Sequence, residues 1–149
     1  VFNKIVLEIN MANFSRTLGL LLRSGVKIVE AITICAATTP NLAYRKALNE
    51  LAEAVRRGVS IASFLGERRG LYPAMVSQMA EVGESTGNLS ETLLYVAEFY
   101  ESEVEEFTKN LSNILEPMIM VLMGSVVGFV AISIITPIYA ITQTVSNIR

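Results

Sequence analysis

A long stretch near the end of the chain contains no charged residue. Neither Lys, Arg, Asp nor Glu occurs over residues 117–148, and every basic residue except Arg149 precedes this stretch. A helix that spans a bilayer needs roughly 20 predominantly apolar residues, so the stretch is long enough to cross a membrane. The alternative is a buried core helix, but such helices seldom run so long without a charge. We therefore predict a helical bundle domain over residues 1–116, a transmembrane helix over 117–142 and a short tail over 143–149.

Residues 1–116 have the apolar periodicity of helices and show no sustained period-two alternation. Helical spacing is clear, for example, in Leu42, Ala47, Leu48, Leu51 and Val55. Proline and glycine divide this region into segments with short connections, which favour antiparallel neighbours. The predicted fold class is all-α: an antiparallel up-and-down six-helix bundle followed by a C-terminal transmembrane helix. The expected helices cover residues 3–24, 28–38, 41–57, 61–66, 74–85 and 89–116.

A short pattern recurs around three glycines. The segment Leu22-Arg-Ser-Gly-Val-Lys-Ile aligns with Val55-Arg-Arg-Gly-Val-Ser-Ile, and residues 84–93 form a looser third copy. Each copy is typical of a helix that ends at a glycine cap, where a positive φ is needed, followed by a tight return into the next helix. Generic helical-hairpin chemistry explains the pattern as well. Both interpretations predict short turns at Gly25, Gly58 and Gly87.

The apolar stripe of the sixth expected helix has the spacing of a straight α-helix. It runs from Leu89 to Ile114 with a mean step of roughly 3.6 residues, and most of the glutamates lie off the stripe. No clear break separates the stripe from Glu116 and Pro117. We therefore expect the helix to continue into the membrane segment, with Pro117 marking a kink at the interface rather than an end.

The composition excludes most catalytic and metal-binding constellations. The sequence has no His, Asp or Trp, and its only cysteine is Cys35. A Ser-His-Asp triad, a Cys-His pair, a histidine-rich zinc site and a Walker-type Asp are therefore impossible. Glu81 and Glu84 share a helix face and can in principle form an acid–base pair or bind calcium, but a solvated helix end is the more ordinary interpretation. We predict no enzyme activity, no cofactor and no metal site.

The net charge and the cysteine content limit the classes of partner and the cellular compartment that we expect for this chain. A net charge of −2 gives no general attraction to nucleic acid. A single cysteine cannot form an internal disulfide, which fits a reducing compartment. The predicted domain holds nearly all the basic residues, so we place it in the cytoplasm. Because the chain begins with Val1 rather than with methionine, we expect it to be a fragment or a processed product.

A series of short motifs covers most of the chain. In order, they are Phe14-Ser-Arg-Thr-Leu, Leu-Leu-Arg-Ser-Gly-Val, Arg-Gly-Val-Ser-Ile, Tyr72-Pro73, Gly83-Glu-Ser-Thr-Gly-Asn-Leu89, Glu116-Pro117 and Pro137-Ile. This ordered series resembles the type II secretion F-domain family, and the Gly-Glu-x-Ser/Thr-Gly-x-Leu segment is its most specific motif. Lys27 stands where the family usually has a Pro or a small residue, and Tyr72 stands where Phe is usual.

The resemblance implies a function and a set of partners. Family members are inner-membrane platform proteins of type II secretion systems and type IV pili, with two helical cytoplasmic domains and three membrane helices. This chain resembles the second cytoplasmic domain and the last membrane helix. The implied function is a non-enzymatic platform that couples a cytoplasmic assembly ATPase to pilin or pseudopilin assembly in the bacterial inner membrane. The expected partners are that ATPase, other inner-membrane subunits, pilin or pseudopilin, membrane lipids and further copies of the chain, with no nucleic acid.

The residues alone are compatible with one other function and disfavour another. A membrane-anchored helical adaptor or signalling module unrelated to secretion would have the same organisation. A transporter or channel subunit is disfavoured, because a pore needs ionisable or strongly polar residues along its lumen. Residues 117–148 offer no ionisable side chain.

The predicted topology gives the bundle a basic tip. If the sixth helix ends at the membrane, it starts at the far end of the bundle, and alternate turns share that end. A cluster of charges there can steer a partner with an acidic surface, and we expect this tip to face the ATPase; a merely solvated tip is the alternative. The predicted tip residues are Arg23, Lys27, Arg56, Arg57 and Glu84.

The topology also predicts two contacts with the membrane. The turns at Pro40 and at residues 66–73 would lie at the membrane end, where Arg68 and Arg69 would face anionic headgroups. Within the predicted transmembrane helix, Gly124 and Gly128 form a Gly-x-x-x-Gly pair. Small residues let helix backbones approach closely, so we expect packing against another helix, although the pair is also common by chance.

Overall fold

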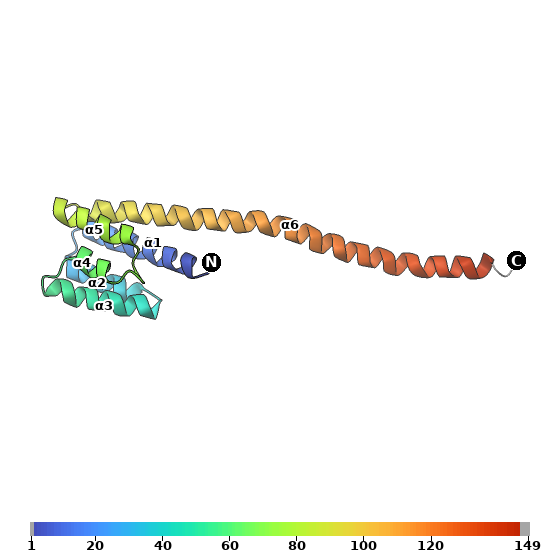
Figure 1. The fold of residues 1–149 in the computed structure, drawn as a ribbon, viewed down its shortest axis with the longest axis horizontal. Coiled ribbons are helices and arrows are strands. Elements are labelled where there is room, and N and C mark those ends of the chain that lie inside the picture. Colours follow the sequence, from blue (N-terminus) through green and yellow to red (C-terminus); the bar gives the residue numbers. More distant parts are fainter. Residues whose placement is uncertain (1, 147–149) are drawn as a thin grey trace. The chain divides into compact units, whose positions relative to one another are not determined.

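The structure is a computed structural model that describes the backbone of residues 2–146 and the side chains of residues 3–135. This part of the chain is helical and contains no strand. It divides into two compact units, Val1–Phe107 and Thr108–Arg149, called unit 1 and unit 2 here. The helices are α1 (Phe2–Arg23), α2 (Ile28–Thr38), α3 (Leu42–Arg56), α4 (Ile61–Glu67), α5 (Ala74–Thr86) and α6 (Leu89–Ser146) (Figure 1).

The prediction of an all-helical fold is confirmed. The bounds of the first five helices differ from the expected ones by at most a single residue at either end. Their ends follow from local chemistry: the Asn41 side chain accepts a hydrogen bond from the Ala43 N–H at 3.0 Å and so caps α3. The sixth helix continues through Pro117, as expected, and does not end there.

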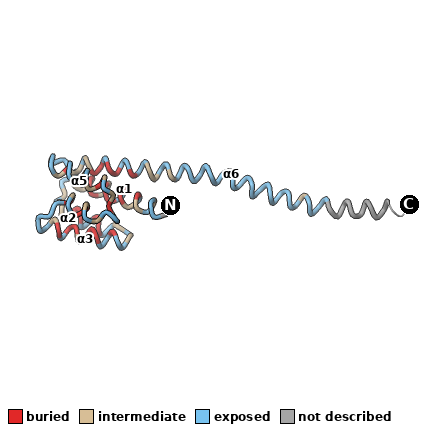
Figure 2. The backbone as a smooth tube through the Cα atoms, in the orientation of Figure 1, coloured by how far each residue is buried: buried red, intermediate tan, exposed pale blue. Residues whose placement is uncertain are grey.

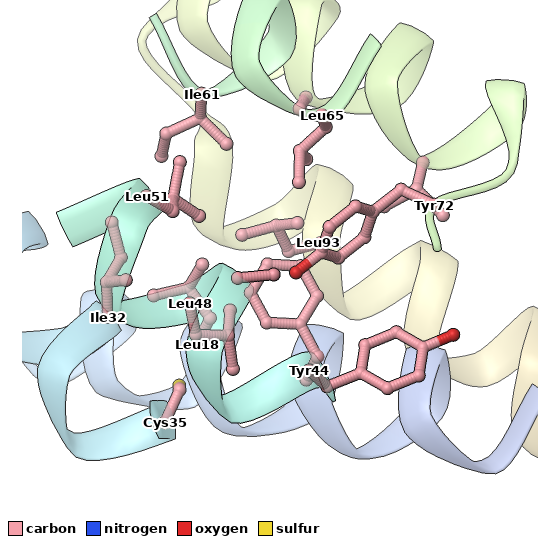
Figure 3. Packing of buried hydrophobic residues seen from close by; sticks show 14 of the residues in the cluster. Leu18, Ile32, Cys35, Tyr44, Leu48, Leu51, Ile61, Leu65, Tyr72 and Leu93 are labelled. Atoms are coloured by element: carbon pink, nitrogen blue, oxygen red, sulfur yellow. The ribbon is translucent and has the colours of Figure 1, made fainter. Parts of the chain in front are cut away.

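Unit 1 has one hydrophobic core, to which α1–α5 and the first part of α6 all contribute (Figure 2). Figure 3 labels core side chains from α1, α2, α3, α4 and α6 and from the connection between α4 and α5. Such cores stabilise a fold mainly by removing apolar surface from water, at roughly 25 cal/mol per Å². Fully buried members include Leu18, Ile32, Leu48, Leu51, Ile61, Leu65, Val76 and Leu93.

Three aromatic rings hold the connection between α4 and α5 against the rest of unit 1. Tyr72, which lies in that connection, is buried; its ring centroid is 6.0 Å from that of Phe14 in α1 and 5.9 Å from that of Tyr44 in α3. The Tyr44 hydroxyl donates a hydrogen bond to the Leu71 carbonyl at 2.9 Å. Tyr72, which stands where the resembled family usually has Phe, is thus a core residue.

Helix α1 packs closely against the beginning of α6. A Cβ atom added to Gly19 would lie only 2.9 Å from Leu94 Cγ and 3.1 Å from the Ser90 carbonyl oxygen. Further along the pair, the Arg16 guanidinium donates to both carboxylate oxygens of Glu101. This hydrogen bond holds the pKa of Glu101 below its ordinary value. The C-terminal end of α1 therefore lies next to the N-terminal end of α6.

The buried core gives unit 1 a predictable sensitivity to alkali. Burial raises the pKa of the Cys35 thiol from 9.0 to about 12, and burial also raises the pKa values of Tyr44 and Tyr100. The unfolded chain releases these protons first as the pH rises. For Cys35 the stabilisation is therefore complete below about pH 9 and is lost as the pH rises from about 9 to about 12, by up to about 1.4 kcal/mol per pH unit. Tyr44 and Tyr100 change the stability in the same direction.

Chemical denaturation followed by circular dichroism should accordingly show a free energy of unfolding that falls steadily above pH 9. The Cys35→Ala variant should show a shallower fall, because one of the titrating groups is gone. A free energy of unfolding that stays level from pH 9 to pH 11 would contradict the assignment of these groups to a dry core.

Unit 2 has a single helical segment with exposed apolar side chains. Two helical stretches of the described chain, Asn3–Arg23 and Leu89–Ile135, are long enough to cross a membrane and contain a sufficiently apolar window of 18 residues. The mean hydropathy of that window is 1.2 in the first stretch and 2.6 in the second. The first is partly buried in the core of unit 1, whereas the apolar window of the second is wholly exposed. A Cβ atom added to Gly124 or Gly128 would have open space within 4 Å.

Candidate functional site

Two turns of unit 1 share one backbone design. At Gly25 and Gly58, the glycine N–H donates to the carbonyl three residues earlier, and the N–H of the following Val26 or Val59 donates to the carbonyl five residues earlier, at 2.9–3.0 Å. The φ angles of the two glycines are 83° and 88°, in the left-handed region where a side chain is strained. The repeated sequence pattern is therefore also a structural repeat. The third turn has Gly87 at a φ of 70°.

The carboxylate of Glu84 caps helix α4. Its Oε1 accepts from the Ile61 N–H at 2.7 Å and its Oε2 from the Ala62 N–H at 3.0 Å. The Ser60 hydroxyl accepts from the Ser63 N–H at 3.1 Å. The first N–H groups of a helix have no partner within the helix and favour a negative charge. Glu84 thus has an internal role: it ties the end of α5 to the turn between α3 and α4.

A second contact ties the end of α5 to the start of α6. A Cβ atom added to Gly83 would lie 2.7 Å from Leu89 Cα and would also collide with the Thr92 hydroxyl. The two helix backbones therefore touch at Gly83. The motif that contains Gly83 and Glu84 indicated this position in the sequence, but the spacing of residues alone does not reveal which backbone the glycine meets.

These contacts gather three turns at one end of unit 1. The Glu84 cap joins the α3–α4 turn to the end of α5, and the contacts of Gly19 and Gly83 place the ends of α1 and α5 next to the start of α6. In Figure 1 the start of α6 and the connection from α3 to α4 lie at the same, left-hand end of the unit. We call this end the tip.

The structure places the four predicted basic residues on turns of the tip, and all four are exposed. Arg23 and Lys27 flank Gly25, and Arg56 and Arg57 directly precede Gly58. Arg56 forms an ion pair with Glu53 on the surface of α3, where both side chains are 58% exposed. Exposed pairs of this kind contribute little to stability, so these cations are available to a partner.

The two arginines predicted to face lipid differ from each other. The Arg68 guanidinium donates to Glu50 Oε2 at 2.8 Å and lies 3.7 Å from the centroid of the Phe64 ring. Arg68 therefore joins α3 to α4 within unit 1. Arg69 is exposed. A change of charge at Arg68 would break these contacts. A change at Arg69 would break no contact that the structure records.

The remaining candidate catalytic or metal-binding residues lie in the core or on the surface of the fold. Cys35 is 1% exposed and lies in the core, and Glu81 is an exposed residue of α5. Among the described residues, no three His, Cys, Asp or Glu side chains come together as a metal site would require. The arrangement at the tip can bind a partner through its charges.

The fold and the tip together define a class of protein: a helical unit with a charged tip, followed by a long, exposed, apolar helix. The chain belongs to the type II secretion system protein F family, because the model of the family "Type II secretion system (T2SS), protein F" matches residues 14–137. The resemblance expected from the sequence motifs is thereby confirmed.

Individual relatives come from both secretion and pilus assembly. The type IV pilus assembly protein PilC of Thermus thermophilus is 36% identical over 146 residues, which cover 98% of this chain and 36% of that protein. PilC of Myxococcus xanthus is 34% identical over 145 residues (97% and 34%), and the type II secretion system protein F of Pseudomonas aeruginosa is 32% identical over 142 residues (95% and 35%). The chain spans about a third of the length of these relatives.

Proposed function

We propose that the chain is part of a non-enzymatic inner-membrane platform of a type II secretion or type IV pilus machine. The observation that carries this proposal is the family match over residues 14–137, which covers most of unit 1 and most of the apolar helix. The platform couples a cytoplasmic assembly ATPase to pilin or pseudopilin assembly and contacts other inner-membrane subunits. The match favours this function over an adaptor or signalling module unrelated to secretion.

In this proposal the two parts of the chain have different surroundings. Residues 1–116 form an antiparallel up-and-down six-helix bundle in the cytoplasm, residues 117–142 span the inner membrane, and residues 143–149 form a short tail. The exposed apolar surface of α6 supports the span, since water disfavours such a surface. Unit 1 holds most of the charged residues, and its single cysteine cannot form an internal disulfide. Both features support a location of unit 1 in the cytoplasm.

The tip is the proposed docking surface for the ATPase. Four exposed cations on neighbouring turns create a local positive potential, although the whole chain has a net charge of −2. Such a patch steers a partner with an acidic surface and makes binding depend on salt. Glu84 contributes indirectly, because its cap orders the turn that carries Arg56 and Arg57.

Charge reversal at the tip tests this proposal. The double variant Arg56→Glu, Arg57→Glu should bind the purified assembly ATPase at least about tenfold more weakly at about 0.1 M salt, a loss of about 1.4 kcal/mol. The difference should shrink towards about 1 M salt, where charges are screened beyond about 3 Å. Binding is measured by interferometry on the detergent-solubilised chain, and circular dichroism should show unchanged helicity and melting.

A matched control changes the same number of charges elsewhere. Lys46 and Arg69 are exposed residues of α3 and of the α4–α5 connection, and reversing both to Glu should leave ATPase binding intact. It should instead loosen the association of unit 1 with vesicles that contain anionic lipid, as expected for the proposed lipid contact of Arg69. Equal losses of ATPase binding in both double variants would remove the tip assignment.

A further inference from the structure

The first part of α6, which belongs to unit 1, has two exposed aromatic side chains on its outer face. Tyr95 is 58% exposed and Phe99 is 42% exposed. Among residues 3–107, the part of unit 1 whose side chains the structure describes, every other aromatic side chain is buried or half-buried. Residues four apart are neighbours on a helix surface, so the two rings form one patch. Exposed aromatic rings are typical anchors of interfaces, because their burial removes a large apolar area from water.

The rest of unit 1 holds this patch in place. On the opposite side of α6, Leu93, Val96 and Tyr100 lie in the core and are at most 6% exposed. The Phe99 ring packs edge-on against the Tyr100 ring, with 5.2 Å between the centroids and 83° between the planes. A ligand that covers the patch therefore meets a surface that is already ordered, which lowers the entropic cost of binding.

Two carboxylates flank the first ring. Glu91 lies four residues before Tyr95 and Glu98 lies three residues after it, so both are neighbours of Tyr95 on the helix surface. Both are exposed, and the ion pairs between α1 and α6 use Glu101 and Glu103 instead. We define the acidic–aromatic face as Glu91, Tyr95, Glu98 and Phe99.

The whole region around this face has one sign of charge. Residues 70–108 contain eight glutamates and no Lys or Arg, whereas residues 1–69 contain ten Lys and Arg and five glutamates. A surface with such a negative potential repels an anionic membrane and an identical face of a second copy. It attracts a cationic partner, because complementary potentials steer association.

Unit 1 itself shows which cation suits a ring beside a carboxylate. The Arg68 guanidinium lies 3.7 Å from the centroid of the Phe64 ring and donates to Glu50 Oε2 at 2.8 Å. A planar guanidinium can stack on a ring and donate to a carboxylate at the same time, whereas the ammonium of lysine is compact and more strongly hydrated. The acidic–aromatic face presents the same two kinds of group to solvent, which favours arginine over lysine in the partner.

We infer that the acidic–aromatic face binds an arginine-bearing basic segment of another protein. A guanidinium of that segment stacks on Tyr95 or Phe99 and donates to Glu91 or Glu98. The inference goes beyond the proposed function, because this face has the opposite charge to the tip and therefore selects a different partner. It does not depend on the membrane insertion of residues 117–142.

Two defined peptides test the arginine preference. Fluorescently labelled nona-arginine and nona-lysine are titrated with the full chain in a neutral detergent at about 0.1 M salt, and anisotropy reports binding. Nona-arginine should bind about threefold more tightly or better, as expected for stacking at an exposed site. The double variant Tyr95→Leu, Phe99→Leu should bind the two peptides almost equally, because it keeps the charges and removes the rings. Glu91→Gln with Glu98→Gln should weaken the binding of both peptides.

A matched control removes the same number of charges from another part of unit 1. Glu30 in α2 and Glu67 in α4 are exposed, and Glu30→Gln with Glu67→Gln should leave the arginine preference intact. Circular dichroism should show unchanged helicity in all variants. Equal binding of both peptides by the unmodified chain, or a preference that survives in the leucine variant, would overturn the inference. A smaller oligomer of the leucine variant in light scattering would also overturn it, since a second copy would then cover this face.

Discussion

Removal of residues 117–149 should convert a detergent-dependent protein into a water-soluble helical one. Unit 1 has its own hydrophobic core, whose residues all precede residue 108 and are retained in the truncated chain. The deleted part, by contrast, has exposed apolar side chains such as Val121 at 71% and Phe129 at 74%. The truncated chain should therefore remain in the supernatant after ultracentrifugation without detergent, and its circular dichroism should be that of a helical protein with a cooperative thermal transition.

The matched control removes only residues 143–149 and leaves the proposed span in place. That variant should sediment with the membrane fraction and should require detergent, as the intact chain should. Recovery of the intact chain as a monodisperse, detergent-free monomer would contradict membrane insertion.

Substitution of Gly83 by Ala should strongly destabilise unit 1. The new Cβ atom would lie 2.7 Å from Leu89 Cα, and a backbone atom can give way only if α5 and α6 move apart. Overpacking of this kind typically costs about 1–3 kcal/mol, and sometimes more. We expect a loss near or above the upper end of that range, measured as a decrease in the free energy of unfolding by urea denaturation in a mild detergent.

Two further variants test whether the clash at Gly83 causes the loss of stability. Gly66 also lies within a helix, but an added Cβ atom there meets nothing nearer than Ser77 Cβ at 3.9 Å, so Gly66→Ala should be neutral or slightly stabilising because alanine favours helix. Adding Thr92→Ala to Gly83→Ala should restore part of the stability, since it removes the hydroxyl but leaves Leu89 Cα in place. A Gly83→Ala variant as stable as the parent would show that α5 and α6 are not held this closely.

The helices of unit 1 could be predicted from the sequence because their ends are encoded locally. Gly25 and Gly58 set the ends of α1 and α3 through bonds that span only a few residues, and Pro73 precedes α5 at a position where a missing N–H is harmless. Apolar periodicity then identifies the faces that enter the core. None of this information requires knowledge of which helices are neighbours.

The pairings between distant residues could not be predicted in this way. Glu84 appeared as an exposed tip charge, and its cap on Ile61 depends on how α4 and α5 are packed. Arg68 appeared equivalent to Arg69, yet only Arg68 has Glu50 and the Phe64 ring within reach. In each case a short polar motif is compatible with several environments, and the tertiary packing selects one.

The cap on α4 has a consequence for the thermodynamics of docking. Helix α4 has seven residues, and isolated helices shorter than about 12–15 residues are marginal in water. Its order therefore depends on contacts with the rest of unit 1, among them those of Glu84, which supplies partners for its first N–H groups from another helix. A protein that docks on the adjacent Arg56 and Arg57 meets a turn whose conformational entropy was already lost when the bundle folded. Its association therefore proceeds without the entropic penalty that a flexible loop would impose on the affinity.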